Sequence, residues 1–209
     1  LAYRLHLVDD QGRVSEIEDP YRFSLHLSGY DLHLLGEGTH FRLFERLGAH
    51  PLRHEGVDGV RFAVWAPNAR RVSVVGDWNG WDGRTQPMRL HPGNGIWEIF
   101  LPGVPVGARY KYEIIGRDGG LLALKTDPVA FAFEPDEPRT ASAVADLNGF
   151  TWGDGEWMDE RKRRNALHRP MSVYEVHLGS WRRAEPDALP SYRELAEQLA
   201  DYVSEMGFT

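Results

Sequence analysis

Few residues of this chain have a type and spacing that could support covalent chemistry. The carboxylates lie mostly in turns and charged runs, apart from Glu175, which lies with His177 inside an apolar stretch at 173–178. Glycoside hydrolysis needs two carboxylates held across the scissile bond, so this single acid and its neighbouring histidine favour a structural role. Phosphate-binding glycine motifs, an H-E-x-x-H zinc pattern and cysteine thiols are absent from the sequence. We therefore predict no catalytic residue, no metal ligand and no cofactor in this chain.

Two tryptophans lie in a polar, glycine-rich turn. Residues 76–82 read Gly-Asp-Trp-Asn-Gly-Trp-Asp, and turns run over the surface of a protein, so at least one of Trp78 and Trp81 is expected to be exposed. A flat ring can stack on the apolar face of a sugar, and Asn79 and Lys111 supply an amide and a cation that suit sugar hydroxyls. The alternative is that a tryptophan closes the end of a β core. We favour this structural role for Trp78, whereas both roles stay open for Trp81.

The composition limits the class of partner. The 209 residues carry a net charge of −7, 42% hydrophobic residues and no cysteine, with seven tryptophans, eight tyrosines and nine phenylalanines. Nucleic acid is not expected as a partner, because there is no excess of lysine and arginine to release its counterions. No apolar run reaches the roughly 20 residues that span a bilayer. Since the absence of cysteine fits a reducing compartment, we predict a cytoplasmic protein without a nucleic-acid or membrane partner.

Residues 51–147 have the pattern of an all-β sandwich. Short stretches of period-two alternation are separated by turns rich in Gly, Pro, Asn and Asp, which is typical of two packed antiparallel sheets. The expected strands lie at 60–64, 72–75, 96–101 and 110–114. Before this unit, residues 1–22 are expected to be the end of a truncated N-terminal β module, a hairpin whose partner strands are missing. Residues 23–50 are expected to be a connector with a short helix at 39–47.

The C-terminal part is expected to begin a second fold. Residues 148–170 have the composition of a linker, in which an acidic run offsets the basic run at 161–164. Residues 173–178 are predicted to form a strand, and 191–206 an amphipathic helix with a capping box that opens at Ser191. A strand followed by a helix is half of a βαβ unit. The strand and the apolar face of the helix are therefore expected to lack the next parallel strand that would cover them.

Several motifs are similar to those of the bacterial-type glycogen (1,4-alpha-glucan) branching enzymes. They are FAVWAPNA at 62–69, VVGDWNGW at 74–81, YKYE at 110–113 and YEVHLGSW at 174–181, the last followed by SYREL at 191–195. The similarity covers nearly the whole chain. The last motif is the most specific, because the others also occur in debranching relatives and in glycogen-sensing regulatory subunits.

The resemblance implies a fold and an activity. It implies an immunoglobulin-like sandwich of the starch-binding type at 51–147, followed at 171–209 by the first strand and helix of an amylase-type (β/α)8 barrel. The family cuts an α-1,4-glucan by a retaining route and transfers the chain to a 6-hydroxyl, forming an α-1,6 branch. Its three catalytic acids lie on later barrel strands, and Glu175 does not replace them. The 209-residue chain alone is therefore expected to be inactive, with α-glucan and the missing remainder of the barrel as partners.

The resemblance also implies which residues bind glucan. Trp81 and Lys111 match the stacking tryptophan and the assisting lysine of the glycogen-sensing relatives, and Asn79 lies in the turn before that tryptophan. A second stacking tryptophan is absent, because Gly-Leu-Leu stands at 120–122. The alternative function is a non-catalytic module that binds glucan or only orients the barrel.

Overall fold

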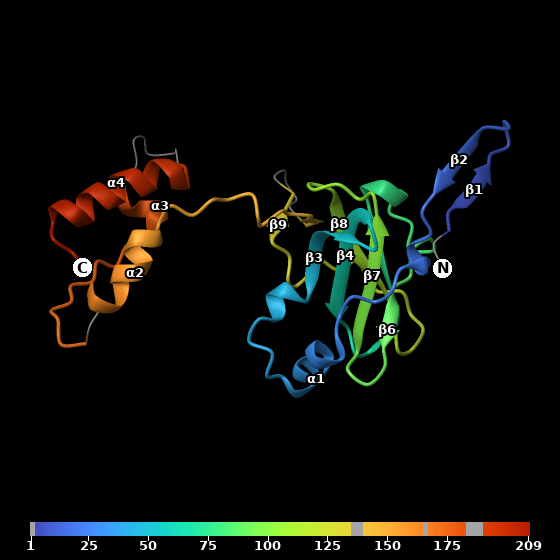
Figure 1. The fold of residues 1–209 in the computed structure, drawn as a ribbon, viewed down its shortest axis with the longest axis horizontal. Helices are drawn as coiled ribbons and strands as arrows, with labels where there is room; N and C mark the ends of the chain where they lie inside the picture. The colour runs from blue at the N-terminus through green and yellow to red at the C-terminus, as the bar shows by residue number, and fades with distance from the viewer. Residues whose placement is uncertain (1–2, 135–139, 165–166, 183–189) are drawn as a thin grey trace. The chain divides into compact units, whose positions relative to one another are not determined.

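The computed structural model describes residues 3–134, 140–164, 167–182 and 190–209 (Figure 1). The chain divides into two units, Leu1–Gly149 and Phe150–Thr209. All strands of the described residues belong to the first unit, whereas the described part of the second unit is helical or irregular.

The first unit begins with a β-hairpin, as the sequence predicts. Strand β1 (Leu5–Val8) pairs antiparallel with β2 (Val14–Ile17). The carboxylate of Asp9 closes the turn by accepting hydrogen bonds from the backbone N–H groups of Gln11 and Arg13, at 2.9 and 2.8 Å. The side chains of both strands are exposed. A two-stranded hairpin without a core is marginal in water, so this turn is important for holding it together.

One sheet of the first unit has four antiparallel strands in the order β3-β4-β7-β6 (Figure 1). Its strands are β3 (Gly48–His54), β4 (Val57–Trp65), β7 (Ile96–Pro102) and β6 (Arg89–His91). Successive side chains of a strand point to opposite faces, so the alternation seen in the sequence sends every second residue of β4 and β7 to the same core. Strand β3 starts inside the stretch that was expected to be a connector.

The other sheet has the order β5-β8-β10-β9 and packs face to face against the first. Its strands are β5 (Ala69–Gly76), β8 (Arg109–Gly116), β10 (Ser142–Ala143) and β9 (Ala132–Phe133). The shared core contains Val60, Phe62, Val64, Trp97, Ile99 and Leu101 from the first sheet and Val72, Val74, Tyr110 and Tyr112 from the second. This two-layer core confirms the predicted immunoglobulin-like sandwich.

The stretch 23–50 was expected to be a connector, but it also packs against the sandwich. Leu27 and Leu47 bury Ala63 and Ile96, which lie on the face of the first sheet that points away from the sandwich core. The first sheet is therefore covered on both faces.

The helix in this stretch is not where the sequence pattern placed it. A regular helix, α1, spans Gly29–Glu37, whereas only a 3-10 turn, η2 (Leu43–Glu45), forms within the predicted range 39–47. A Ser28–Asp31 capping box starts α1, although the glycine at its first position and Gly36 obscure the helical pattern. A second 3-10 turn, η1 (Pro20–Arg22), links the hairpin to this segment.

A buried carboxylate holds the covering segment on the sheet. Glu98 lies on β7 with 1% of its surface exposed. It accepts hydrogen bonds from the backbone N–H groups of His26 (2.7 Å) and Leu27 (3.3 Å), and Nε2 of His91 lies 2.7 Å from its Oε2. A buried carboxylate without such partners would be strongly destabilising, so the position of Glu98 and that of the 26–27 backbone depend on each other.

The second unit does not contain the predicted strand at 173–178. Its described elements are the helices α2 (Gly155–Arg164), α3 (Leu178–Trp181) and α4 (Tyr192–Glu205), and α2 falls inside the predicted linker. Residues 171–177 have no regular structure. A strand needs a hydrogen-bonding neighbour, and no strand occurs in 150–164, 167–182 or 190–209. The prediction of a strand was therefore wrong for this structure.

The predicted C-terminal helix is present. Ser191 accepts a hydrogen bond from the N–H of Glu194, whose carboxylate in turn accepts from the N–H of Ser191 at 2.8 Å, and Gly207 follows the helix with a positive φ of 73°. Its apolar face was expected to be uncovered. Leu195 is instead only 3% exposed, whereas Val173 of the preceding segment is 75% exposed. The burial of Leu195 contradicts the expectation of an uncovered helix face, whereas the exposure of Val173 agrees with the expected lack of cover.

The basic run of α2 is offset by an acid within the helix itself. Glu160 forms ion pairs with Arg163 and Arg164, both at 2.7 Å. Among the described residues, no helix combines the length and the apolar composition needed to cross a membrane.

We expect Glu98→Gln to lower the free energy of unfolding of the first unit by about 2 kcal/mol. The glutamine side chain loses the negative charge, and its NH2 group would face the N–H donors that the carboxylate accepts from. Asp58→Asn is the matched control, since Asp58 is exposed and its ion pair with Arg53 is 3.4 Å long. Its cost should stay within about 0.5 kcal/mol. Urea unfolding followed by tryptophan fluorescence measures both, and equal losses would contradict the role of Glu98.

The same carboxylate predicts a pH dependence. Burial alone raises the pKa of Glu98, but hydrogen bonds from His91 and from the backbone of His26 and Leu27 outweigh it and leave the pKa below its ordinary value of 4.5. A carboxyl with a lowered folded-state pKa stabilises the fold above its unfolded-state pKa and loses this effect as the pH falls through the folded value. The stability gap between wild type and Glu98→Gln should therefore shrink below about pH 4.5 in urea titrations. A gap independent of pH would argue against this linkage.

Candidate functional site

The turn after β5 is held together by the side chain of Asn79. This turn contains a 3-10 element, η3 (Asp77–Asn79). The amide oxygen of Asn79 accepts from the N–H of Gly76 at 2.9 Å, and its Nδ2 donates to the carbonyl of Val74 at 3.1 Å and to Oε1 of Gln86 at 2.9 Å. The Asn79 amide is thus engaged on both sides in fixing the turn that carries the two tryptophans.

Trp78 closes one part of the sandwich core. Its ring packs on the buried Phe62, with 5.6 Å between ring centroids, and its Nε1 donates to Oε1 of Gln86 at 2.6 Å. Gly76 leaves room for this ring, because a Cβ on that residue would lie 2.5 Å from it. Trp78 therefore has the structural role that the sequence favours.

Trp81 has a different environment. It is partly exposed, and its φ of 61° is unusual for a residue with a side chain. The backbone N–H of Trp81 donates a hydrogen bond to the carbonyl of Gly76 at 3.2 Å. The pKa of Asp77 is lowered mainly by hydrogen bonds from the side chain of Arg109 and, to a smaller extent, by one from the side chain of Trp81. These contacts set the position of the Trp81 ring at the surface.

The ring of Trp81 borders an open hollow of about 490 Å3 on the outer face of the second sheet. The other side chains that line it are Arg71, Asp82, Arg84, Glu113, Ile115 and Leu121. Three of these come from strands β5 and β8, where Arg71 is the register partner of Ile115. The hollow therefore combines an aromatic ring, two aliphatic side chains and charged hydrogen-bonding groups.

Charged pairs surround this hollow. Arg71 and Glu113 form an ion pair, and Arg84 lies 2.7 Å from the carboxylate of Asp82 and lowers its pKa to about 2. Gly83 packs so closely on Glu113 that a Cβ would lie 2.1 Å from the carboxylate. The loop after Trp81 is thus seated directly on strand β8. The paired charges can offer hydrogen bonds to a neutral polar ligand without strongly favouring an ion.

Lys111 lies on the same outer face of β8, opposite Val75 in the strand register. Its Nζ donates to Oγ1 of Thr140 at 2.8 Å, and Lys111 does not line the hollow beside Trp81. The residues on either side, Tyr110 and Tyr112, point into the core and donate their hydroxyls to Asp127 at 2.7 and 3.0 Å. The strand that carries Lys111 is therefore firmly anchored.

Sequence reasoning did not find several residues of this hollow. Arg71 and Glu113 come together only through the pairing of β5 with β8. The sequence indicated only that each of them lies on the outward-facing side of its strand. Leu121, in the stretch where a second stacking tryptophan would be expected, lines the hollow as an aliphatic side chain.

Glu175 and His177, the residues first considered for chemistry, are both exposed in the second unit. Nδ1 of His177 lies 3.1 Å from Oγ of Ser180. Within the described parts of the chain, no group of three or more histidine and acidic side chains could hold a metal ion.

Comparison with known proteins identifies the class of this fold. Residues 46–130 match the family described as "Carbohydrate-binding module 48 (Isoamylase N-terminal domain)". The 1,4-alpha-glucan branching enzymes GlgB of Rhodospirillum rubrum and Rubrobacter xylanophilus are each 58% identical to this chain, over 100% and 99% of its length. The chain spans 28% of the length of each of these relatives. Among solved structures, a Klebsiella pneumoniae pullulanase complexed with maltotriose is 28% identical over 49% of this chain and 10% of its own, with a TM-score of 0.38.

The fold and the comparisons agree with the motifs in the sequence. The sandwich contains the matched module, and the similarity to the branching enzymes continues through the helical second unit. Over nearly its whole length the chain is therefore similar to a portion of the 1,4-alpha-glucan branching enzymes GlgB, and its sandwich contains the stretch that matches carbohydrate-binding module 48.

Proposed function

We propose that this chain is the glucan-binding part of a 1,4-alpha-glucan branching enzyme and that the hollow beside Trp81 binds α-glucan. The observation that carries this proposal is the combination of a positioned, partly exposed indole ring with Arg71, Arg84 and Glu113 around one hollow. A flat ring can cover the apolar face of a glucose unit, while the charged side chains accept and donate hydrogen bonds to its hydroxyls. The family of the module is consistent with this ligand class.

The three residues selected from the sequence have different proposed roles. Trp81 stacks on a glucose ring, and Asn79 acts by holding the turn rather than by contacting sugar, because its amide is already hydrogen-bonded on both sides. Lys111 contacts a hydroxyl of a neighbouring glucose unit only after exchanging its hydrogen bond with Thr140. Its contribution to affinity is therefore expected to be smaller than that of Trp81.

The activity proposed for the whole protein is transfer of a cut α-1,4-glucan chain to a 6-hydroxyl. Its catalytic acids would be supplied outside these 209 residues, and the second unit would contribute helix α4 to the barrel. No nucleic acid, membrane or cofactor is part of this proposal. A cytoplasmic location stays a prediction from the absence of cysteine.

We expect the 209-residue chain to leave amylose unchanged, because the sequence similarity places the catalytic acids of the family on later barrel strands and Glu175 and His177 are both exposed. The iodine absorbance of amylose incubated with the chain measures this. A fall in absorbance that persists after the protein is repurified would contradict the assignment of catalysis to other parts of the protein.

We expect Trp81→Ala to weaken retention on glycogen in affinity electrophoresis, with a loss of about 1 kcal/mol in binding free energy from the stacked ring. Trp157→Ala is the matched control, because Trp157 is an exposed tryptophan of helix α2 and should leave the mobility unchanged. Equal mobility of wild type and Trp81→Ala would favour the alternative, a module that only orients the barrel.

Asn79→Ala should lower the free energy of unfolding by about 1–2 kcal/mol, because Gly76 N–H and Val74 carbonyl lose their partner. Glycogen retention should fall with it, since the ring of Trp81 is no longer positioned. The exposed Asn68, which accepts one hydrogen bond from Arg117 at 3.2 Å, provides the control Asn68→Ala. Thermal unfolding and affinity electrophoresis of both variants test this. Weaker binding with unchanged stability would instead assign Asn79 to direct sugar contact.

A further inference from the structure

A second exposed tryptophan borders a separate groove at the end of the first sheet. Trp65 is the last residue of β4, and 62% of its surface is exposed. In the register of the sheet it lies opposite Ile96 and on the same face as Ala63, so its side chain points away from the sandwich core. Neither the sandwich core nor the hollow beside Trp81 uses this side chain.

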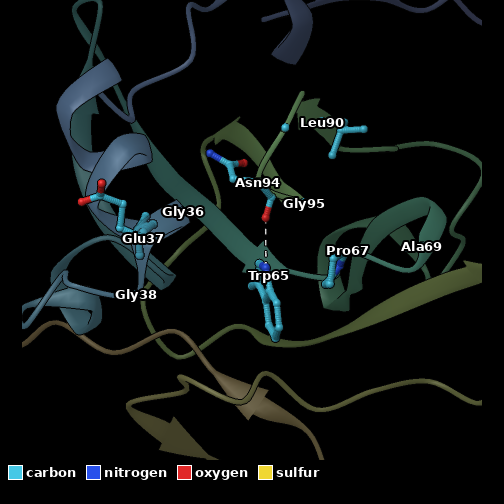
Figure 2. Close-up of a pocket in the computed structure, with 11 residues that line it drawn as sticks. Gly36, Glu37, Gly38, Trp65, Pro67, Ala69, Leu90, Asn94 and Gly95 are labelled. Atoms are coloured by element: carbon cyan, nitrogen blue, oxygen red, sulfur yellow. Dashed lines mark hydrogen bonds between the residues drawn. The ribbon is translucent and has the colours of Figure 1, made fainter.

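The indole of Trp65 is held in one orientation. Its Nε1 donates to the carbonyl of Asn94 at 3.0 Å, the contact drawn as a dashed line in Figure 2. Next to it, the N–H of Ala66 donates to the carbonyl of Gly95 at 2.9 Å. Gly95 has a φ of 72° and packs against Pro67, where a Cβ would lie only 2.6 Å away. The polar edge of the ring is therefore satisfied and its flat faces stay available.

The groove around this ring is open, and its lining residues carry little charge. It has a volume of about 650 Å3, within the range of small-molecule sites. One wall is the end of helix α1, where Gly36 and Gly38 leave the backbone open, and the other holds Pro67 and the turn with Asn94 (Figure 2). Glu37 is the one charged side chain of the lining, and its carboxylate lies 3.5 Å from Nε2 of His33.

We propose that this groove is a second α-glucan subsite, with Trp65 as its stacking platform. An immobilised ring next to an amide, one carboxylate and open glycine backbone suits a neutral ligand that has an apolar face and many hydroxyls. A single carboxylate gives no reason to bind an anion, and the groove has no cluster of charge for a polyelectrolyte. The inference rests on the proposed glucan-binding function and adds a site that is formed by the other sheet.

Two subsites on one module have a consequence for long chains. A ligand with many glucose units, such as a glycogen particle, can occupy both, and the second contact then forms at a high effective concentration. Glycogen retention should therefore fall more in the Trp65→Ala, Trp81→Ala double variant than in either single variant. Binding of a short maltooligosaccharide should lose only the affinity of the altered subsite.

The test uses the 209-residue chain with maltoheptaose and glycogen as probes. The indole N–H resonance of Trp65, assigned by its loss in Trp65→Ala, should shift on titration with maltoheptaose. Trp65→Ala should raise the Kd of that subsite about fivefold, as expected for one stacked ring, and lower glycogen retention. Trp152→Ala, which alters a 75% exposed tryptophan of the second unit, should behave as wild type.

A second variant blocks the groove without removing the ring. Gly36 lies in helix α1, and a Cβ on this residue would have no atom closer than 3.9 Å, so Gly36→Gln should fold and place its side chain in the groove. It should reproduce the loss seen with Trp65→Ala. If both variants bind both probes as wild type while Trp81→Ala does not, the second subsite is refuted and the proposed function stands. If the wild-type chain binds neither probe, both proposals fail.

Discussion

The burial of Glu98 is the constraint on which much of this structure depends. A carboxylate in the interior must be hydrogen-bonded, and the available donors are His91 and the backbone N–H groups of residues 26 and 27. These hydrogen bonds hold the N-terminal segment on the outer face of the first sheet. Helix α1 then covers that face and forms one wall of the groove at Trp65. A polar group that would be costly by itself thus organises an apolar layer and a surface groove.

Three tryptophans of the sandwich have rings that lie in different environments. Trp78 donates to the side-chain oxygen of Gln86 and packs against the core, whereas Trp65 donates to the backbone carbonyl of Asn94 and is 62% exposed. The backbone N–H of Trp81 donates to the carbonyl of Gly76 at 3.2 Å, next to Asp77, which is paired with Arg109 at 3.0 Å. Because each ring is positioned before any ligand arrives, little side-chain entropy is left to lose on binding.

The described part of the second unit is not held together by strand pairing as the sandwich is. Its described residues contain no strand pair, and the stretch 171–177 is held by hydrogen bonds between Ser172 and Thr209 and by aromatic side chains. Tyr174 packs against Tyr202 and Phe208 with ring centroids 5.3 and 5.0 Å apart, and Nε1 of Trp181 donates to the Tyr174 hydroxyl at 2.8 Å. This small aromatic cluster lies against the carboxyl-terminal half of α4. An apolar period-two pattern therefore became a strand in the first unit, where neighbours exist, and stayed irregular here.

The sequence by itself determined the features that depend on neighbours along the chain. The alternation in β4 and β7, the Ser191–Glu194 cap and the turn at 76–82 follow from local periodicity and hydrogen bonding, and all are present in the structure. Tertiary structure alone decided where Glu98 finds its donors, which groups join Trp81 and that Trp65 faces a groove. These contacts link residues up to 72 positions apart. Burial and hydrogen bonding across such separations depend on how the sheets and the covering helix pack, and no local pattern contains that information.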